Sequence, residues 1–177
     1  RLIQVLFRYR ALVASLVSRE LKARYRGSVL GFLWSFANPV LLLITYTLVF
    51  MIILPMKQTP RMEPYFLFFF TGLLPWTWFT SSLLEGSSVL IAGGNLIKKV
   101  LFPAEVLPAV TVLTNMVQFL IGLPILIVLL AFAGRLGPEA LLLPVVVFVQ
   151  LVLTLGGALF LSALTVHFRD IGNILGH

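Results

Sequence analysis

From residue 29 almost to its end, this chain is apolar in runs long enough to cross a membrane. It is 60% hydrophobic and 11% charged, whereas a soluble domain is about half apolar and about a quarter charged. A helix of about 20 apolar residues spans a hydrocarbon core, and the runs that meet this requirement are Val29–Leu54, Tyr65–Leu84, Ala104–Ala133 and Ala140–Val166. They lack the alternation typical of barrel strands. We therefore predict an all-α integral membrane protein with four transmembrane helices.

The N-terminal segment differs from the rest of the chain. Residues Arg1–Arg26 hold seven of the thirteen basic residues and one acid, Glu20. Apolar residues recur at three-to-four spacing from Leu2 to Val17, which is typical of an amphipathic helix lying in the membrane interface. An ordinary helix packed on protein is the alternative. We expect residues 1–28 to form this cytoplasmic segment and residues 29–177 to form the transmembrane domain.

The distribution of Lys and Arg predicts the orientation. With the N-terminus inside, ten basic residues lie on the inner side, and only Lys57, Arg61 and Arg135 lie on the outer side. Such an excess marks the cytoplasmic face, so we expect both ends of the chain in the cytoplasm of a bacterium and the spans in its inner membrane.

The same charges argue against other functions. A net charge of +7 placed beside apolar spans orients the protein and attracts anionic lipid heads, so we expect membrane lipid and no nucleic acid as partner. The chain has no cysteine and no phosphate-binding loop, and its six acids are scattered. This pattern predicts no metal, no resident cofactor and no catalytic residue.

Each predicted span carries a sparse row of polar residues at helical spacing. The rows are Trp34, Asn38 and Thr45; Thr71, Trp78, Ser82 and Glu85; Thr111, Asn115, Gln118 and Gly122; and Gln150, Thr154 and Gly157. A polar group facing lipid is costly, so the rows face protein or a wet cavity. For any single residue, helix–helix packing is the commoner role. The presence of a row in every span favours a path for a polar solute.

The segment between the second and third spans suggests a docking element. Gly93 and Gly94 break the helix, and Asn95 is suited to cap a short new helix. One face of that helix would offer Leu96, Lys99 and Val100. A mere connector is the alternative, although nearly twenty residues is long for one.

Several stretches together resemble the permease subunit of an ABC-2 type exporter, in the branch that exports lipid-linked polysaccharide such as O-antigen, capsule or teichoic acid. They are KARYRGSVLGFLW at Lys22–Trp34 with Asn38 and Pro39, GLLPW at Gly72–Trp76, NLIKKVLFP at Asn95–Pro103 with Glu105 and Pro108, and SALTVHFRDI at Ser162–Ile171. Their joint order is more specific than any one of them.

The resemblance implies six transmembrane helices per subunit, a homodimer and separate ATPase subunits that bind ATP and Mg. Because only four spans are predicted, we expect the sequence to be a piece of a longer protein. We expect the ATPase to be contacted by Arg24, Arg26, Asn95, Leu96, Lys98, Lys99 and Val100. We expect the path for a lipid-linked glycan to be lined by Trp34, Asn38, Thr45, Trp78, Ser82 and Glu85. The alternative function is a membrane enzyme that acts on a lipid-linked sugar.

Overall fold

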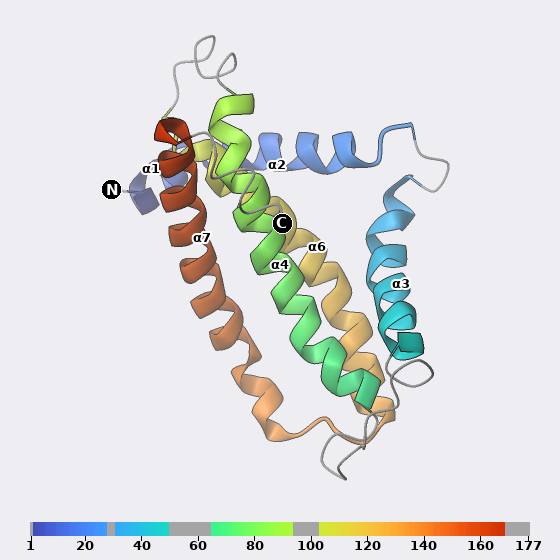
Figure 1. The fold of residues 1–177 in the computed structure, drawn as a ribbon. Helices are drawn as coiled ribbons and strands as arrows, with labels where there is room; N and C mark the ends of the chain where they lie inside the picture. The colour runs from blue at the N-terminus through green and yellow to red at the C-terminus, as the bar shows by residue number, and fades with distance from the viewer. Residues whose placement is uncertain (1, 28–30, 50–64, 94–102, 169–177) are drawn as a thin grey trace.

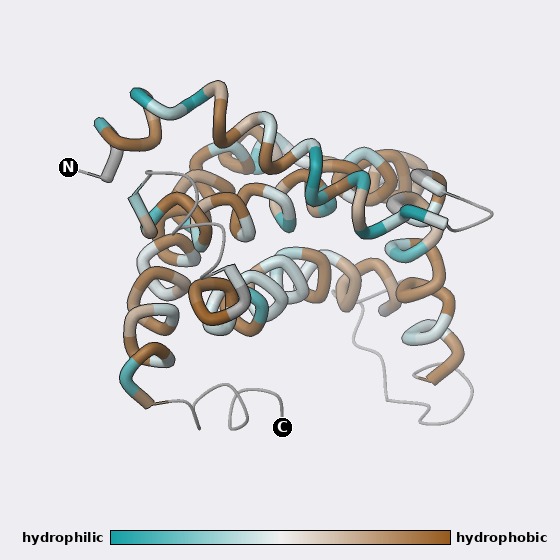
Figure 2. Tube along the Cα trace, turned by 90° about the horizontal axis from the view of Figure 1, so that it is seen from above, coloured by the Kyte–Doolittle hydropathy of each residue, from teal (hydrophilic) through white to brown (hydrophobic). Residues whose placement is uncertain are grey.

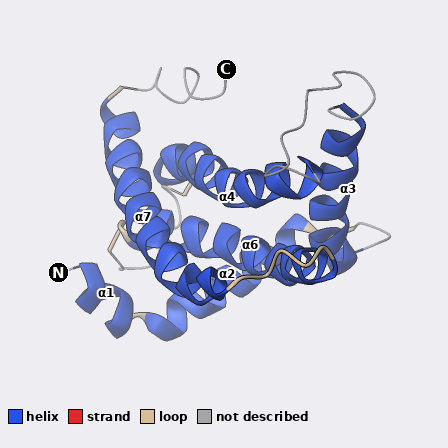
Figure 3. Cartoon of the chain, turned by 90° about the horizontal axis from the view of Figure 1, so that it is seen from below, coloured by secondary structure: helices blue, strands red, loops and turns tan. Residues whose placement is uncertain are grey.

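The structure, a computed structural model, describes residues 2–27, 31–49, 65–93 and 103–168, and these ranges contain helices and no strand (Figure 3). The elements are α1 (Leu2–Arg8), α2 (Arg10–Arg24), the short 3₁₀ helix η1 (Gly31–Leu33), α3 (Trp34–Leu48), α4 (Tyr65–Ala92), α6 (Val106–Phe132), the 3₁₀ helix η3 (Pro138–Leu142) and α7 (Leu143–His167). The prediction of an all-α membrane protein is confirmed.

Three segments within the described ranges are long and apolar enough to cross a membrane: Phe66–Ile91, Val106–Phe132 and Pro138–His167. They correspond to the second, third and fourth predicted spans. The first predicted span, 29–54, contains the shorter apolar helix Phe36–Leu48. Residues 28–30 and 50–54 lie outside the described residues, so the full length of this span stays a prediction. So does the division of the chain at residue 28.

The second span continues two turns beyond its predicted end at Leu84. The predicted end of this span was therefore too early, because α4 runs to Ala92. The serines in this part suit a helix, since Ser87 Oγ donates to the Leu84 carbonyl at 2.7 Å and Ser88 Oγ to the Glu85 carbonyl at 3.2 Å. Such bonds within one turn satisfy hydroxyls that would otherwise favour a loop.

The long helices form a bundle in which α4 and α6 lie in the middle, with α7 on one side and α3 on the other (Figures 1 and 3). The core of the bundle contains Phe70, Leu74, Trp78, Phe119 and Leu126. Pro39, Pro75 and Pro124 lie inside α3, α4 and α6 without ending these helices. Proline therefore does not interrupt these helices.

Helix α2 lies across one end of this bundle rather than along it (Figure 1). We call this the α2 end; the C-terminal end of α4 and the N-terminal end of α6 lie there too. Val13 and Leu16 of α2 form a buried cluster with Val106, Leu107 and Val110 of α6. Burial of each such side chain stabilises the fold by about 1.5–3 kcal/mol.

The N-terminal prediction is therefore refined in two ways. The expected single helix is interrupted at Tyr9, which separates α1 from α2. The centre of its apolar stripe packs on α6, which agrees with the packed alternative. Hydrophilic residues recur along α1 and α2, whereas apolar residues dominate the helices of the bundle (Figure 2). Its position across the bundle end also fits a helix at the membrane surface.

Candidate functional site

The C-terminal end of α2 is fastened to the bundle by a closed set of polar contacts. Arg24 donates through Nη2 to Glu85 Oε2 of α4, with which it forms an ion pair, and through Nη1 to Asn115 Oδ1 of α6 at 3.0 Å. Asn115 in turn donates through Nδ2 to Glu85 Oε2 at 2.9 Å. Three helices thus meet at one triangle of side chains.

A second contact lies one turn further along α6. Gln118 Nε2 donates to the Tyr25 hydroxyl at 3.0 Å, and Tyr25 directly follows Arg24. We call Arg24, Tyr25, Glu85, Asn115 and Gln118 the polar junction. It joins distant parts of the chain, because Arg24 and Asn115 are 91 positions apart, so only the fold brings them together.

The polar junction makes an acid tolerable beside apolar spans. An unpaired carboxylate out of water would cost several kcal/mol, but Glu85 has a positive partner and an amide donor. Its side chain keeps 41% exposure, against 22% for Arg24. Arg24 also closes the last turn of α2, where a positive charge interacts favourably with the helix dipole. Electrostatics therefore hold α2 at a fixed place on α4 and α6.

A cavity of about 160 Å³ lies next to the polar junction. Its polar lining comes from Tyr25, Asn38, Thr77, Ser81, Asn115 and Gln118. These residues belong to α3, α4, α6 and the turn after α2, so the cavity lies where four segments converge. We call it the inter-helix cavity.

Trp78 forms a rigid wall of this cavity. Its indole Nε1 donates to the Val112 carbonyl at 3.2 Å, and its ring stacks on that of Phe119 with centroids 5.0 Å apart. Trp78 is only 2% exposed. The bond and the stack together fix the ring against α6.

The structure brings some of the predicted path residues together and separates others. Asn38 and Trp78 line the inter-helix cavity, and Glu85 is linked to it through Asn115. Trp34, at the start of α3, is half-buried and does not line the inter-helix cavity. Thr45, near the C-terminal end of the same helix, is exposed and does not line it either. Whether any of these residues contacts a substrate stays a prediction.

Ser82 occupies a different environment from its neighbours in the row. It is fully buried, and its hydroxyl has no hydrogen-bond partner among the described residues. One turn on, at the position of Gly86, an added Cβ would lie 3.1 Å from Ala158 Cβ of α7. Residues four apart share a helix face, so Ser82 lies on the α7 side of α4, in a seam of small residues. This environment favours the packing role for Ser82.

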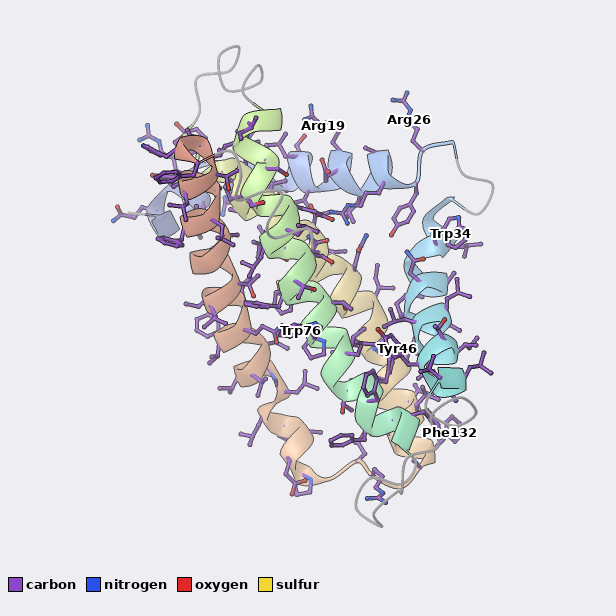
Figure 4. All side chains as sticks on the ribbon, viewed as in Figure 1. Arg19, Arg26, Trp34, Tyr46, Trp76 and Phe132 are labelled. Atoms are coloured by element: carbon purple, nitrogen blue, oxygen red, sulfur yellow. The ribbon has the colours of Figure 1, made fainter. Side chains whose placement is uncertain are left out.

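The residues expected to contact an ATPase are only partly described. Asn95, Leu96, Lys98, Lys99 and Val100 lie outside the described residues. Arg24 points into the bundle, where its guanidinium is engaged in the polar junction. Arg26 is exposed, and Figure 4 shows it and Arg19 pointing away from the bundle. Arg19 was not among the residues predicted from the sequence to contact an ATPase.

Tyr25, Ser81, Asn115 and Gln118 were also missed as site residues. Asn115 and Gln118 were visible in a polar row, but nothing marked that row as facing α2. Ser81 and Tyr25 gave no signal beyond their residue type. Helical spacing identifies a face without identifying the element that covers it.

Long apolar helices, a helix that lies across one end and a polar cavity among them define a multi-pass membrane protein. Residues 11–176 match the family of the ABC-2 type transporter, and the chain belongs to this family. It is a transport subunit of the membrane rather than an enzyme.

The chain is similar to proteins named O-antigen export system permease protein RfbA. The protein from Myxococcus xanthus is 45% identical over 178 residues, which is 100% of this chain and 67% of the relative. One from Klebsiella pneumoniae is 35% identical over 162 residues, covering 90% and 61% respectively. The chain thus spans roughly two thirds or less of the length of these relatives.

Proposed function

We propose that this chain is the permease subunit of an ATP-driven exporter that moves a lipid-linked glycan out of the cytoplasm across the bacterial inner membrane. The observation that carries this proposal is its similarity along the whole chain, at 45% identity, to a protein named for O-antigen export. In the proposed complex, two permease copies surround the path, and partner subunits hydrolyse ATP with Mg.

The arrangement of α2 supports a role in coupling. Apolar packing of Val13 and Leu16 on α6 holds the middle of this helix, and the polar junction holds its end. A helix fixed at two places moves together with the elements it contacts. Force applied to α2 by an ATPase would therefore reach α4 and α6 directly.

Basic residues on α2 and in the turn after it support a docking role. Arg19, Lys22 and Arg26 are exposed, and none of them belongs to the polar junction. A basic face suits an acidic surface of a soluble partner. We therefore assign ATPase docking to Arg19 and Arg26, together with the predicted contacts of segment 95–100.

The test uses the full-length permease, coexpressed with its ATPase and reconstituted in lipid vesicles. Arg19→Glu with Arg26→Glu should abolish copurification of the ATPase and the stimulation of ATP hydrolysis by glycan-lipid. Arg19→Lys with Arg26→Lys keeps the charge and should retain both. Normal copurification with the Glu variants would overturn this assignment of the docking face. Absence of ATP-dependent glycan movement by the unmodified complex would overturn the proposed function.

A further inference from the structure

The inter-helix cavity has a wall that differs from the others. α4 and α6 pack closely along their length, whereas α3 makes far fewer contacts with either of them. Asn38, Pro39 and Leu42 of α3 form this wall. A ligand could therefore enter by a small outward movement of α3 that leaves the α4–α6 contact unchanged.

The lining of the inter-helix cavity is polar but uncharged. Among the described residues that line it, the polar groups are hydroxyls and carboxamides, and none carries a charge. Arg24 and Glu85 lie beyond Asn115 and neutralise each other. A phosphate would lack a positive partner in such a cavity, whereas hydroxyl groups would find both donors and acceptors.

Part of this hydrogen-bonding capacity is uncommitted. In the part of the chain that the structure describes, neither Asn38 nor Ser81 makes a side-chain hydrogen bond, and both line the cavity. Another part of the lining is apolar and includes Leu42, Leu74 and Phe119. A sugar ring combines the same two features, because its hydroxyls lie around the edge and its C–H groups form an apolar face.

The volume agrees with an occupant of this kind. A cavity of about 150 Å³ holds a benzene ring, so the inter-helix cavity of about 160 Å³ has room for one six-membered ring.

We propose that the inter-helix cavity is a subsite that binds one uncharged sugar unit, with Asn38 and Ser81 as hydrogen-bonding groups and Trp78 as a fixed wall. This inference rests on the proposed function and names a place within one subunit where the glycan is held.

Two adjacent serines allow a matched test. Ser81 lines the cavity, whereas Ser82 is fully buried in the seam with α7. Because the chain contains no cysteine, Ser81→Cys and Ser82→Cys can each be made in the full-length permease with its ATPase. We expect a small methanethiosulfonate reagent to label Ser81→Cys readily and to leave Ser82→Cys almost unlabelled.

Occupancy is tested with the methyl glycosides of glucose, mannose and rhamnose as probes. A bound sugar slows labelling of Ser81→Cys by a factor of about two when its concentration equals the dissociation constant. Ser81→Cys that stays as unreactive as Ser82→Cys would overturn the proposal, since the cavity would then be closed. Ready labelling without protection by any probe would also overturn it, since the cavity would then hold water only.

Export provides the second measurement. Ser81→Trp fills the cavity and should abolish glycan export, Ser81→Ala removes one of the two hydrogen-bonding groups and should weaken export, and the melting temperature of both variants shows whether they fold. Normal export by folded Ser81→Trp would overturn the subsite. Sugar protection of Ser81→Cys in a complex that exports no glycan would support the sugar site and overturn the proposed function, so the two failures are distinguishable.

Discussion

Arg24 and Glu85 are 61 residues apart in the chain, yet their side chains form an ion pair where α2 meets α4. The pair unites a helix that lies across the bundle with one that runs along it. Asn115 binds both partners and closes the triangle from α6. The place of α2 on the bundle is therefore specified by directional bonds as well as by apolar contact.

Arg24→Ala should lower the stability of the protein by removing both guanidinium contacts. We expect a loss of about 1 kcal/mol, less than the roughly 1.5–3 kcal/mol of a buried charged hydrogen bond, because Glu85 is 41% exposed. Thermal unfolding in detergent, followed by tryptophan fluorescence, measures this loss. Lys22→Ala, on the exposed side of the same turn, is the control. Exchange of the two charges, with Arg24→Glu and Glu85→Arg, should recover part of the loss. Equal stability of Arg24→Ala and Lys22→Ala would show that the ion pair contributes nothing.

Gly86→Val should separate α4 from α7. An added Cβ at Gly86 would already lie 3.1 Å from Ala158 Cβ, whereas Gly72 in the same helix has nothing within 4 Å of that position. Overpacking of this kind costs about 1–3 kcal/mol. Gly72→Val is the matched control and should unfold near the wild-type temperature. If both variants lost stability equally, the cause would be the helix propensity of valine rather than the contact with α7.

Helical periodicity predicted three long spans well and the surroundings of their polar residues poorly. α6 and α7 begin and end within three residues of their predicted limits. α4 was predicted too short, because Glu85 was treated as the end of an apolar run. The sequence contains no sign that a charge from another helix would accompany this acid.

The polar row of the second predicted span shows that helical spacing does not predict which neighbour each residue contacts. Trp78, Ser82 and Glu85 do recur at helical spacing. In the fold Trp78 contacts α6, Ser82 lies on the α7 side and Glu85 reaches α2. A row that spans a wide arc of a helix meets several neighbours, and the spacing alone does not identify them.

Leu16→Asp should detach α2 from α6. Leu16 is buried in the cluster that covers Val110, which is 6% exposed, and a charge there would be left without a partner. Labelling of Val110→Cys by a maleimide should therefore become fast in the Leu16→Asp background. Phe7→Asp changes a residue of α1 that is 71% exposed and should leave Val110→Cys protected. Continued protection with Leu16→Asp would mean that elements other than α2 shield α6.

Cysteine labelling in intact cells tests the orientation. Leu136, which is 48% exposed, follows the C-terminal end of α6, and Arg26 lies at the α2 end. An impermeant maleimide should label Leu136→Cys from outside and should label Arg26→Cys only after the membrane is permeabilised. The reverse pattern would place α2 outside the cell and would contradict the Lys/Arg asymmetry.

The contact between α2 and α6 also has a consequence for biogenesis. A ribosome makes α2 first, and 91 residues separate Arg24 from its partner Asn115, a delay of about 5–20 seconds at ordinary elongation rates. During that interval α6 is not yet present to cover the apolar side of α2. The membrane surface can shield these apolar side chains from water. The interfacial state and the packed state of this helix are then successive stages of one assembly process. The arrival of α6 converts a transient lipid contact into a permanent protein contact.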